Sequence, residues 1–425
     1  MKTLTVALIG AGCRGQTYTD KMKDDRFKVV AVAEPVKEQR ELIKKIHNIP
    51  EEMCFTNYEE LLSQPKIADI AIISTVDSMH FDPTMKAIEK GYNLLLEKPV
   101  APTAEECVKI ANFASEKGVK ILVCHVLRYT QFFGKIKELI NKNALGKVMS
   151  IHHSECVGNE HQSHSYVRGN WGNTAKSSNM LLAKSCHDID IIQWLIGSKC
   201  KNVQSFGSLS YFTNQNAPKD APEYCIDGCP HSEECNYNAV KLYLKDNKGR
   251  WFRYAATKTN NSTDEQVIKI LKTTQYGKCV FKCDNDVVDH QVVNLEFENG
   301  AVASFNMCAF NEGGRFIRVM GTEGEIYGNM ETNTLDYFNF KTREHEIINP
   351  STINLTSSIT DGHGGGDSGI VNTLYKYLTE DYQGDLLSEI GISVENHLIT
   401  FAAEKSRIKN KVINIKEFEK ETGLK

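Results

Sequence analysis

Long apolar runs are missing from this sequence. Nowhere do 18 apolar residues follow one another, and the apolar stretch near the start, residues 5–9, is only as long as a strand. We therefore predict neither a membrane span nor a signal peptide. A basic excess is also missing, because 50 Lys and Arg residues face 54 Asp and Glu residues. We therefore expect no nucleic-acid partner.

Repeats and low-complexity tracts are missing too. With 425 residues, the chain is longer than one hydrophobic core usually serves, so we expect two domains. The 13 cysteines are an odd number, so at least one of them cannot pair in a disulfide bond within the chain. Because an export signal is also missing, we expect a cytoplasmic protein whose thiols are core residues or metal ligands.

Short β-branched runs alternate with helical patterns over residues 1–125. This alternation predicts parallel βαβ units, in which helices cover the faces of a parallel sheet. We predict strands at residues 5–9, 29–33, 70–74, 94–96 and 121–124. We predict helices at residues 14–23, 38–46, 58–63, 83–90 and 104–117, the last one capped by Thr103 with Glu106 at N3. Residues 1–125 are therefore expected to form a doubly wound α/β domain.

Longer strands with alternating polar and apolar residues begin beyond residue 125. Residues 289–297 and 301–307 show this pattern, and Glu298-Asn299-Gly300 between them is a tight-turn signal. We therefore predict that residues 126–425 form an α+β domain with a mostly antiparallel sheet. Residues 214–237 are irregular and rich in Pro, Asp and Cys, so we interpret them as an insertion.

A glycine-rich loop follows the first predicted strand directly. Residues 10–15 read Gly-Ala-Gly-Cys-Arg-Gly, a G-x-G-x-x-G motif that opens the first helix. The first glycine makes the turn, the second lets a pyrophosphate approach the backbone, and the third packs the helix against the strand. The start of the helix then faces the phosphate charge. The motif predicts a dinucleotide bound to a Rossmann domain, with cofactor contacts at Gly10, Gly12, Cys13, Arg14 and Gly15.

A carboxylate ends the second predicted strand. Glu34 follows the last glycine by 19 residues, where an acid normally binds the adenosine ribose hydroxyls. Since a carboxylate repels a 2′-phosphate, Glu34 favours NAD over NADP; the alternative is a solvated Glu at a strand end. Arg40, about one helical turn further on, is a candidate contact for the adenine or a phosphate and leaves NADP open.

Four further motifs follow along the chain. They are Ser74-Thr75 with His80, Leu96-Glu97-Lys98-Pro99, the segment 185–197 around His187, and Gly321-Thr322-Glu323-Gly324-Glu325. Together with the glycine loop, and in this order, they resemble the Gfo/Idh/MocA family of oxidoreductases over essentially the whole chain. The resemblance implies NAD(P)-dependent chemistry on sugar-like substrates. It makes Lys98 and His187 the catalytic pair, and it places at the cofactor Ser74, Thr75, His80, Glu97 and Lys98.

The chemistry of the catalytic pair agrees with that role. Oxidising an alcohol needs a base for the hydroxyl proton, and histidine titrates close to neutral pH. Lys98 ends a parallel strand, where such sheets bind ligands, and its ammonium can polarise the reacting oxygen. Asp190 shares a helix face with His187 and is expected to bind substrate or support the imidazole. The alternative for His187 is an interior residue with no catalytic role.

One position departs from the family pattern. Many members carry an Asp four residues before the histidine, whereas this chain has Ala183 followed by Lys184. The departure puts the family's proton relay in doubt. Lys184 either replaces the Asp as a substrate ligand or is a solvated helix residue.

Polar and aromatic residues near the motifs are candidate substrate contacts. Such a group suits a polyhydroxylated ring, although surface loops collect polar residues regardless of function. The candidates are Arg128 and Tyr129 after the fifth strand, and His164, Tyr166, Arg168 and Trp171 before the helix of His187. The glycine-rich segment His363-Gly364-Gly365-Gly366-Asp367 is a further candidate.

Three cysteines lie close together in the insertion. Cys225, Cys229 and Cys235 have C-x3-C-x5-C spacing, which suggests a structural zinc site. The fourth ligand could be Cys283, Cys279 or His231, and an iron–sulfur cluster is the less favoured occupant. The alternative is three free thiols, because this is not a standard zinc-finger spacing.

Two enzymatic functions stay open from the sequence. The first is reversible hydride transfer between NAD and a hydroxyl of a sugar, sugar acid, cyclitol or glycoside. The second is an NAD-dependent glycosidase that works by transient oxidation, elimination and re-reduction, as some relatives of the family do. A sensor of sugar or NAD that kept the fold is a third, non-enzymatic alternative. By analogy with the family, we expect a homodimer or homotetramer built on the exposed face of the antiparallel sheet.

Overall fold

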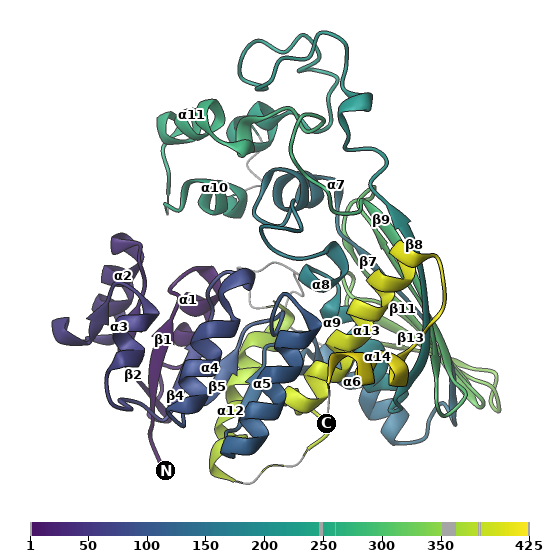
Figure 1. Ribbon diagram of the computed structural model, residues 1–425. Helices are drawn as coiled ribbons and strands as arrows, with labels where there is room; N and C mark the ends of the chain where they lie inside the picture. Colours follow the sequence, from purple (N-terminus) through teal and green to yellow (C-terminus); the bar gives the residue numbers. More distant parts are fainter. Residues whose placement is uncertain are drawn as a thin grey trace.

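Two sheets and the helices that pack on them form the molecule (Figure 1). The computed structural model of the chain describes residues 2–245, 250–259, 261–350, 363–380, 382 and 384–423. Among these residues, no helix has the length and apolar character needed to cross a membrane.

The first sheet has six parallel strands in the order β3-β2-β1-β4-β5-β6. The strands are β1 (Leu4–Ile9), β2 (Phe27–Ala33), β3 (Cys54–Phe55), β4 (Ile70–Ile73), β5 (Asn93–Leu96) and β6 (Ile121–Val123). The helices between them are α1 (Cys13–Asp20), α2 (Lys37–His47), α3 (Tyr58–Ser63), α4 (Phe81–Glu89) and α5 (Ala104–Lys117). The sheet grows in both directions from β1, which confirms the predicted doubly wound Rossmann fold.

Local sequence explains these elements well. Every residue of β4 is buried, as expected for a central parallel strand covered by helices on both faces. Helix α5 starts where the Thr103 side chain accepts a hydrogen bond from the Glu106 N–H, and it ends at Gly118 with a φ of +64°. Both ends agree with the prediction. The short edge strand β3 was not predicted, because two residues carry no readable alternation.

The second sheet has nine strands in the order β14-β13-β12-β11-β7-β10-β9-β8-β15. The neighbours β7 and β10 run parallel and the other pairs run antiparallel, which confirms the prediction. The strands are β7 (Val148–Cys156), β8 (Cys200–Ser208), β9 (His290–Phe297), β10 (Val302–Cys308), β11 (Gly314–Gly321), β12 (Gly324–Asn329), β13 (Thr334–Asn339), β14 (His345–Ile348) and β15 (Ile413–Asn414). Gly300 takes the left-handed φ of +84° that the predicted turn before β10 requires.

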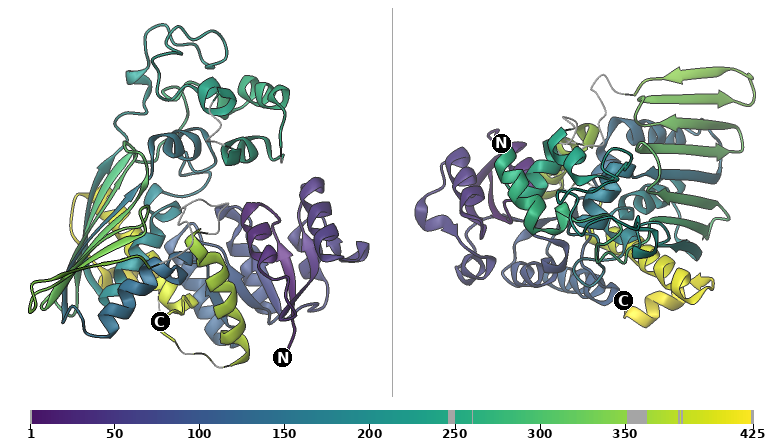
Figure 2. Two further views of the ribbon diagram at one scale, coloured as in Figure 1. Left: turned by 180° about the vertical axis from the view of Figure 1, so that it is seen from behind. Right: turned by 90° about the horizontal axis from the view of Figure 1, so that it is seen from above.

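Helices cover one face of this second sheet (Figures 1 and 2). They are α6 (Gln131–Asn141), α8 (Met180–Ala183), α9 (Cys186–Ile196), α13 (Ile390–Lys409) and α14 (Ile415–Thr422). Helix α12 (Gly366–Thr379) instead returns to the first domain, where Ile370 and Leu374 share a buried cluster with Val6 and Leu8 of β1. The Rossmann core therefore takes one helix from the predicted second domain.

The insertion extends well beyond the irregular stretch at residues 214–237. It continues into α10 (Arg250–Thr257) and α11 (Asp264–Thr273), and a short α7 (Asn159–His161) lies near them. The views agree that α10 and α11 stand over the edge of the Rossmann domain that carries α1 (Figures 1 and 2). The insertion thus reaches from the second domain towards the glycine loop.

Candidate active site

The glycine loop leaves open space where the sequence predicts a phosphate. Gly10 has a φ of +91°, and a side chain there would meet the carbonyl oxygen of Ser74 at 2.6 Å. A side chain on Gly15 would collide with the carbonyl of Gly10. At Gly12, by contrast, no heavy atom of the described protein lies within 4 Å of the place a Cβ would take. A dinucleotide phosphate fits this gap, because the first turn of α1 offers free N–H groups there.

Glu34 lies beside this loop at the end of β2. Its buried carboxylate accepts hydrogen bonds from the N–H groups of Ala11 at 2.7 Å and Val36 at 2.9 Å. Arg40 donates to the carbonyl oxygens of Glu34 and Pro35. The carboxylate therefore adjoins the glycine loop, while the guanidinium is held on the backbone of the strand end.

The residues after β4 hold the loop and the Lys98 turn together. Ser74 Oγ donates to the carbonyl of Gly10 at 2.8 Å. The buried His80 ring places Nδ1 at 2.6 Å from the carbonyl of Pro99 and Nε2 at 3.2 Å from that of Thr75. The side chains of Ser74 and His80 thus hold the backbone of Gly10, Thr75 and Pro99 around the predicted cofactor site.

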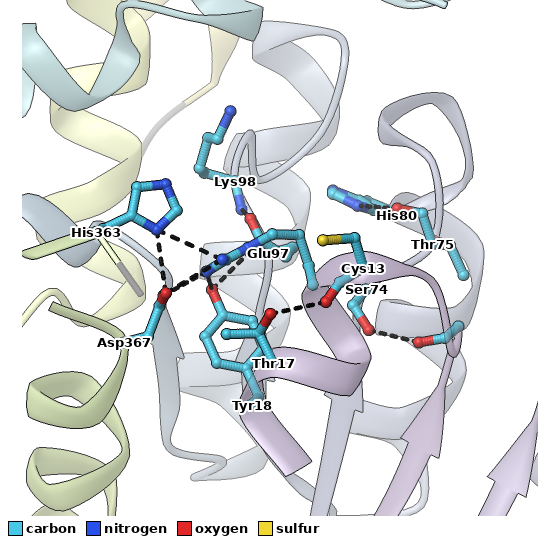
Figure 3. Close-up of polar contacts among 12 residues, drawn as sticks. Cys13, Thr17, Tyr18, Ser74, Thr75, His80, Glu97, Lys98, His363 and Asp367 are labelled. Atoms are coloured by element: carbon cyan, nitrogen blue, oxygen red, sulfur yellow. Dashed lines mark hydrogen bonds and ion pairs between the residues drawn. The ribbon is translucent and has the colours of Figure 1, made fainter. Parts of the chain in front are cut away.

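Glu97 is the centre of a buried polar network (Figure 3). It accepts hydrogen bonds from Arg14 Nε at 2.8 Å and from the Tyr18 hydroxyl at 2.6 Å. Arg14 also pairs with Asp367, whose other contact is His363. Burial opposes ionisation of Glu97, but Arg14 and Lys98 outweigh it and lower the pKa of this carboxyl. Because the Arg14 side chain is engaged in this network, only the backbone N–H of Arg14 is available to a phosphate. The same contacts hold the glycine-rich segment 363–367 beside the helix that follows the glycine loop.

Lys98 connects the two domains. Its ammonium extends away from the network and donates to the carbonyl of Ala183 at 2.7 Å (Figure 3). Ala183 ends α8, and α9 with His187 follows directly. The peptide bond between Lys98 and Pro99 is cis. The structure thus brings the predicted lysine to the segment that carries the predicted histidine.

His187 is buried at the start of α9. It is 7% exposed, and its Nδ1 has no hydrogen-bond partner among the described residues. Burial, and then the charge of Lys98, hold the pKa of His187 well below its usual range. The ring is therefore neutral at pH 7 and available as a base. His125 lies edge-on at 5.8 Å; it was not predicted, although it closely follows β6 at the edge where parallel sheets bind ligands.

Asp190 and Arg128 are engaged with each other inside the protein. The Asp190 carboxylate accepts two hydrogen bonds from Arg128, at 2.7 and 2.6 Å, and one from Asn396 at 2.6 Å. Both side chains are buried. The Tyr129 hydroxyl is likewise 2.8 Å from Ser388 Oγ. These three predicted substrate contacts make internal bonds, and among the described residues Asp190 does not pair with His187.

Lys184 takes part in a second buried charge network. Its ammonium is 3.1 Å from Glu155, which also pairs with Arg315 at 2.6 Å, and Arg315 reaches Asp188 at 2.8 Å. The Lys184 side chain is only 16% exposed, so it is not the solvated helix residue of one prediction. Glu155, Asp188 and Arg315 were missed because they come from three separate segments of the chain.

The predicted aromatic contacts divide into two groups. Tyr166 packs near Trp171 at 6.0 Å, and Trp171 Nε1 donates to Asp77 of the Rossmann domain at 3.0 Å. His164 and Arg168 contact the insertion instead. His164 Nδ1 is 2.6 Å from the Tyr243 hydroxyl, and Arg168 donates to two backbone carbonyls, of Lys278 and Tyr237. Only Tyr166 and Trp171 therefore lie near the meeting point of the domains.

The structure does not support the predicted zinc site at Cys225, Cys229 and Cys235. In the described part of the chain, no group of three His, Cys, Asp or Glu side chains could hold a metal ion. Cys225 and Cys279 are buried in apolar clusters, and Cys235 and Cys283 pack partly buried against one of them. Burial raises the pKa of Cys283 to about 11, which keeps that thiol protonated. The buried guanidinium of Arg168 is 3.9 Å from Cys225 Sγ, so an arginine provides the positive charge beside this thiol.

Two models of the Gfo/Idh/MocA oxidoreductase family match the chain. The NAD-binding Rossmann fold matches residues 4–125, and the C-terminal alpha/beta domain matches residues 137–381. The chain belongs to this family. The resemblance drawn from its motifs is thereby confirmed, and so is the expectation of an oxidoreductase.

Two curated proteins and one solved structure are among those similar to the chain. The oxidoreductase YteT of Bacillus subtilis (strain 168) is 24% identical over 330 residues, 75% of this chain and 74% of YteT. A 2,7-anhydro-N-acetylneuraminate hydratase of Mediterraneibacter gnavus is 28% identical over 211 residues, which span about half of each chain, 49% and 53%. The solved structure of a levoglucosan dehydrogenase with NADH and levoglucosan has a TM-score of 0.69 at 17% identity, over 97% of this chain and 100% of the other. That likeness shows the fold alone.

Proposed function

We propose that this protein is an NAD-dependent oxidoreductase that acts on a hydroxyl of a sugar, cyclitol or glycoside. One observation carries the proposal. The Lys98 ammonium, at the carboxyl edge of the Rossmann sheet, bonds to the carbonyl of Ala183, just before the helix of His187. This bond supports the proposal, because it brings the lysine to the segment that carries the histidine.

The two side chains have complementary roles in this proposal. The glycine loop would hold the pyrophosphate of NAD, and the bound cofactor would supply the group that exchanges a hydride with the substrate. Lys98 binds the reacting oxygen and stabilises the negative charge that develops on it, for which the ammonium exchanges its bond to the Ala183 carbonyl. His187 takes the hydroxyl proton, since its lowered pKa keeps the imidazole neutral at pH 7. Tyr166 and Trp171 supply apolar faces for a ring-shaped substrate.

Glu34 supports NAD as the cofactor. Its carboxylate adjoins the glycine loop through the Ala11 N–H, and a 2′-phosphate near it would be repelled. Arg40 bonds to two backbone carbonyls at the end of β2. We therefore propose that the protein binds NAD more tightly than NADP.

Titration calorimetry followed by a substrate screen tests this function. We expect the purified chain to bind NAD+ more tightly than NADP+, and to form NADH with at least one member of a panel of sugars, inositols and glycosides. If neither dinucleotide binds, the proposal is wrong. If NAD+ binds but no panel member is turned over, the sensor alternative replaces it.

A second candidate function is a redox-dependent glycosidase or lyase. It is favoured by the similarity to a 2,7-anhydro-N-acetylneuraminate hydratase, whose name describes no net oxidation. This function would use the same oxidation as its first step, followed by elimination and return of the hydride. Product release with catalytic amounts of NAD and no net NADH identifies this second function, whereas stoichiometric NADH identifies a dehydrogenase.

We also propose that a second copy of the chain covers the open face of the nine-stranded sheet. Apolar side chains on that face are exposed, at 47% for Phe206, 47% for Val302 and 52% for Tyr327. Such a patch is typical of an interface. The assembly would be a homodimer or homotetramer.

A further inference from the structure

Helix α10 joins the insertion to the first helix of the Rossmann domain. Towards the insertion, the Trp251 ring lies edge-on to His161 at 5.1 Å and to His164 at 5.0 Å. Towards the Rossmann domain, the Tyr254 hydroxyl accepts a hydrogen bond from Gln16 of α1 at 3.4 Å. The two contacts come from residues three apart, which share one side of a helix. The helix therefore spans the space above the glycine loop, as the ribbon views show (Figures 1 and 2).

Tyr254 and Lys258 lie beside the loop at two points. Burial and the neighbouring Cys13 raise the pKa of Tyr254, and Glu34 adds to this effect. The hydrogen bond from Gln16 places the Tyr254 hydroxyl at α1, and the charge of Glu34 acts on it from the end of β2. Lys258 follows α10 directly, four residues after Tyr254, so the two residues share a face. Burial lowers the pKa of Lys258, and the charge of Cys13 on α1 opposes that shift. The Lys258 N–H still bonds to the carbonyl of Tyr254 at 2.7 Å, which ties it to the helix.

The Lys258 ammonium makes no hydrogen bond or ion pair with the residues that the structure describes. Through Tyr254, the helix before it bonds to Gln16 of α1. The start of α1 is the end where the helix dipole is positive and where Gly12 leaves open space. Two positive groups converging on one gap repel each other unless an anion lies between them. A phosphate fits that requirement.

We propose that α10 closes over the dinucleotide, with Lys258 binding its pyrophosphate and Tyr254 bonding to its adenosine half. The proposal rests on the proposed function, because it requires a dinucleotide at the glycine loop. The insertion then takes part in cofactor binding.

Calorimetry on the full chain tests the role of Lys258. The variant Lys258→Met keeps the aliphatic stem and removes the charge, and Lys269→Met on α11 is the matched control, because Lys269 is exposed on the same insertion. We expect Lys258→Met to bind NAD+ and ADP-ribose about 10- to 100-fold more weakly, the effect of losing one charged hydrogen bond. Lys269→Met should bind both like the wild type. Adenosine, which has no phosphate, should bind equally to all three proteins.

Hydrogen exchange provides a second measurement that needs no variant. Binding of ADP-ribose to the wild-type chain should slow amide exchange in residues 250–257. Equal NAD+ affinities of the two lysine variants, or unchanged amide exchange in α10, would overturn the proposal that α10 closes over the dinucleotide. Failure of the wild type to bind NAD+ and NADP+ would instead overturn the proposed function, so the two failures are distinguishable.

Discussion

A lysine and a histidine from two different domains form the proposed catalytic pair. We expect Lys98→Met and His187→Asn each to lower kcat/KM by about 100- to 10,000-fold, the usual loss when a general acid or base is removed. Lys109→Met is the matched control, because Lys109 is an exposed lysine of the same domain. Steady-state kinetics on the best panel substrate measure the effect. A loss below threefold in either variant would remove that residue from the chemistry.

The lowered pKa of His187 makes a second prediction at this scale. A base works only when it is deprotonated, so lowering its pKa moves the acid limb of the activity profile to lower pH. Burial and Lys98 lower this pKa, and the usual histidine value is 6.5. We therefore expect kcat/KM for alcohol oxidation to stay level as the pH falls from 8 to 6.5 and to decline only below that. An acid limb centred at or above pH 6.5 would contradict the assignment.

The sequence motifs identified single functional residues better than they identified which residues pair with each other. Lys98, His187 and Glu34 could be assigned from sequence because each has a fixed place after a strand or in a motif. The pairing of Asp190 could not, since helical spacing shows that two residues share a face but not that Arg128 lies closer. Arg315 and Glu155 are 160 positions apart and meet only through the pairing of β11 with β7.

The position of helix α12 in the Rossmann core leads to a prediction about stability. Leu374 is fully buried in the cluster that contains β1, whereas Lys376 on the same helix is exposed. We expect Leu374→Ala to lower the free energy of unfolding by about 2–5 kcal/mol, because it leaves a cavity in the Rossmann core. Lys376→Ala should change it by less than about 0.5 kcal/mol. Urea unfolding followed by circular dichroism measures both, and equal values would show that α12 adds nothing to this core.

Elements were predicted most accurately where local signals are strong. The cap at Thr103 and the glycine at residue 118 define α5, and all five strands predicted for the first sheet are present. Helices α10 and α12 show the limit of that reasoning. An amphipathic pattern tells which side of a helix is buried but not which sheet or loop it covers, and in both cases the partner lies over 200 positions away.

The whole molecule places its proposed site between two domains that share one hydrophobic core. Trp171 bonds to Asp77 at 3.0 Å and Lys98 bonds to the carbonyl of Ala183 at 2.7 Å, both across the boundary. The sequence predicted two domains and their sheets, but not these contacts, because each joins residues from separate motifs. We propose that substrate specificity arises at this boundary, since one domain carries the glycine loop and the other carries His187.

The open face of the nine-stranded sheet leads to the last prediction. On β10, Ala303, Phe305 and Met307 are buried against the covering helices, while Val302 and Asn306 point the other way. A sheet with one solvated face normally carries polar side chains there. Phe206 and Val302 are instead nearly half exposed, at 47% each, and burying them against a second copy would remove that apolar area from water.

Light scattering coupled to size-exclusion chromatography measures this assembly. We expect the wild type to have the mass of a dimer or tetramer, and the double variant Phe206→Glu with Val302→Glu to have a lower mass, because four or more carboxylates would face one another across the interface. Ile46→Glu is the control, since Ile46 is an apolar residue 40% exposed on the Rossmann domain. Its mass should equal that of the wild type. A monomeric wild type, or a double variant with unchanged mass, would place the interface elsewhere and leave the exposed apolar face to another partner.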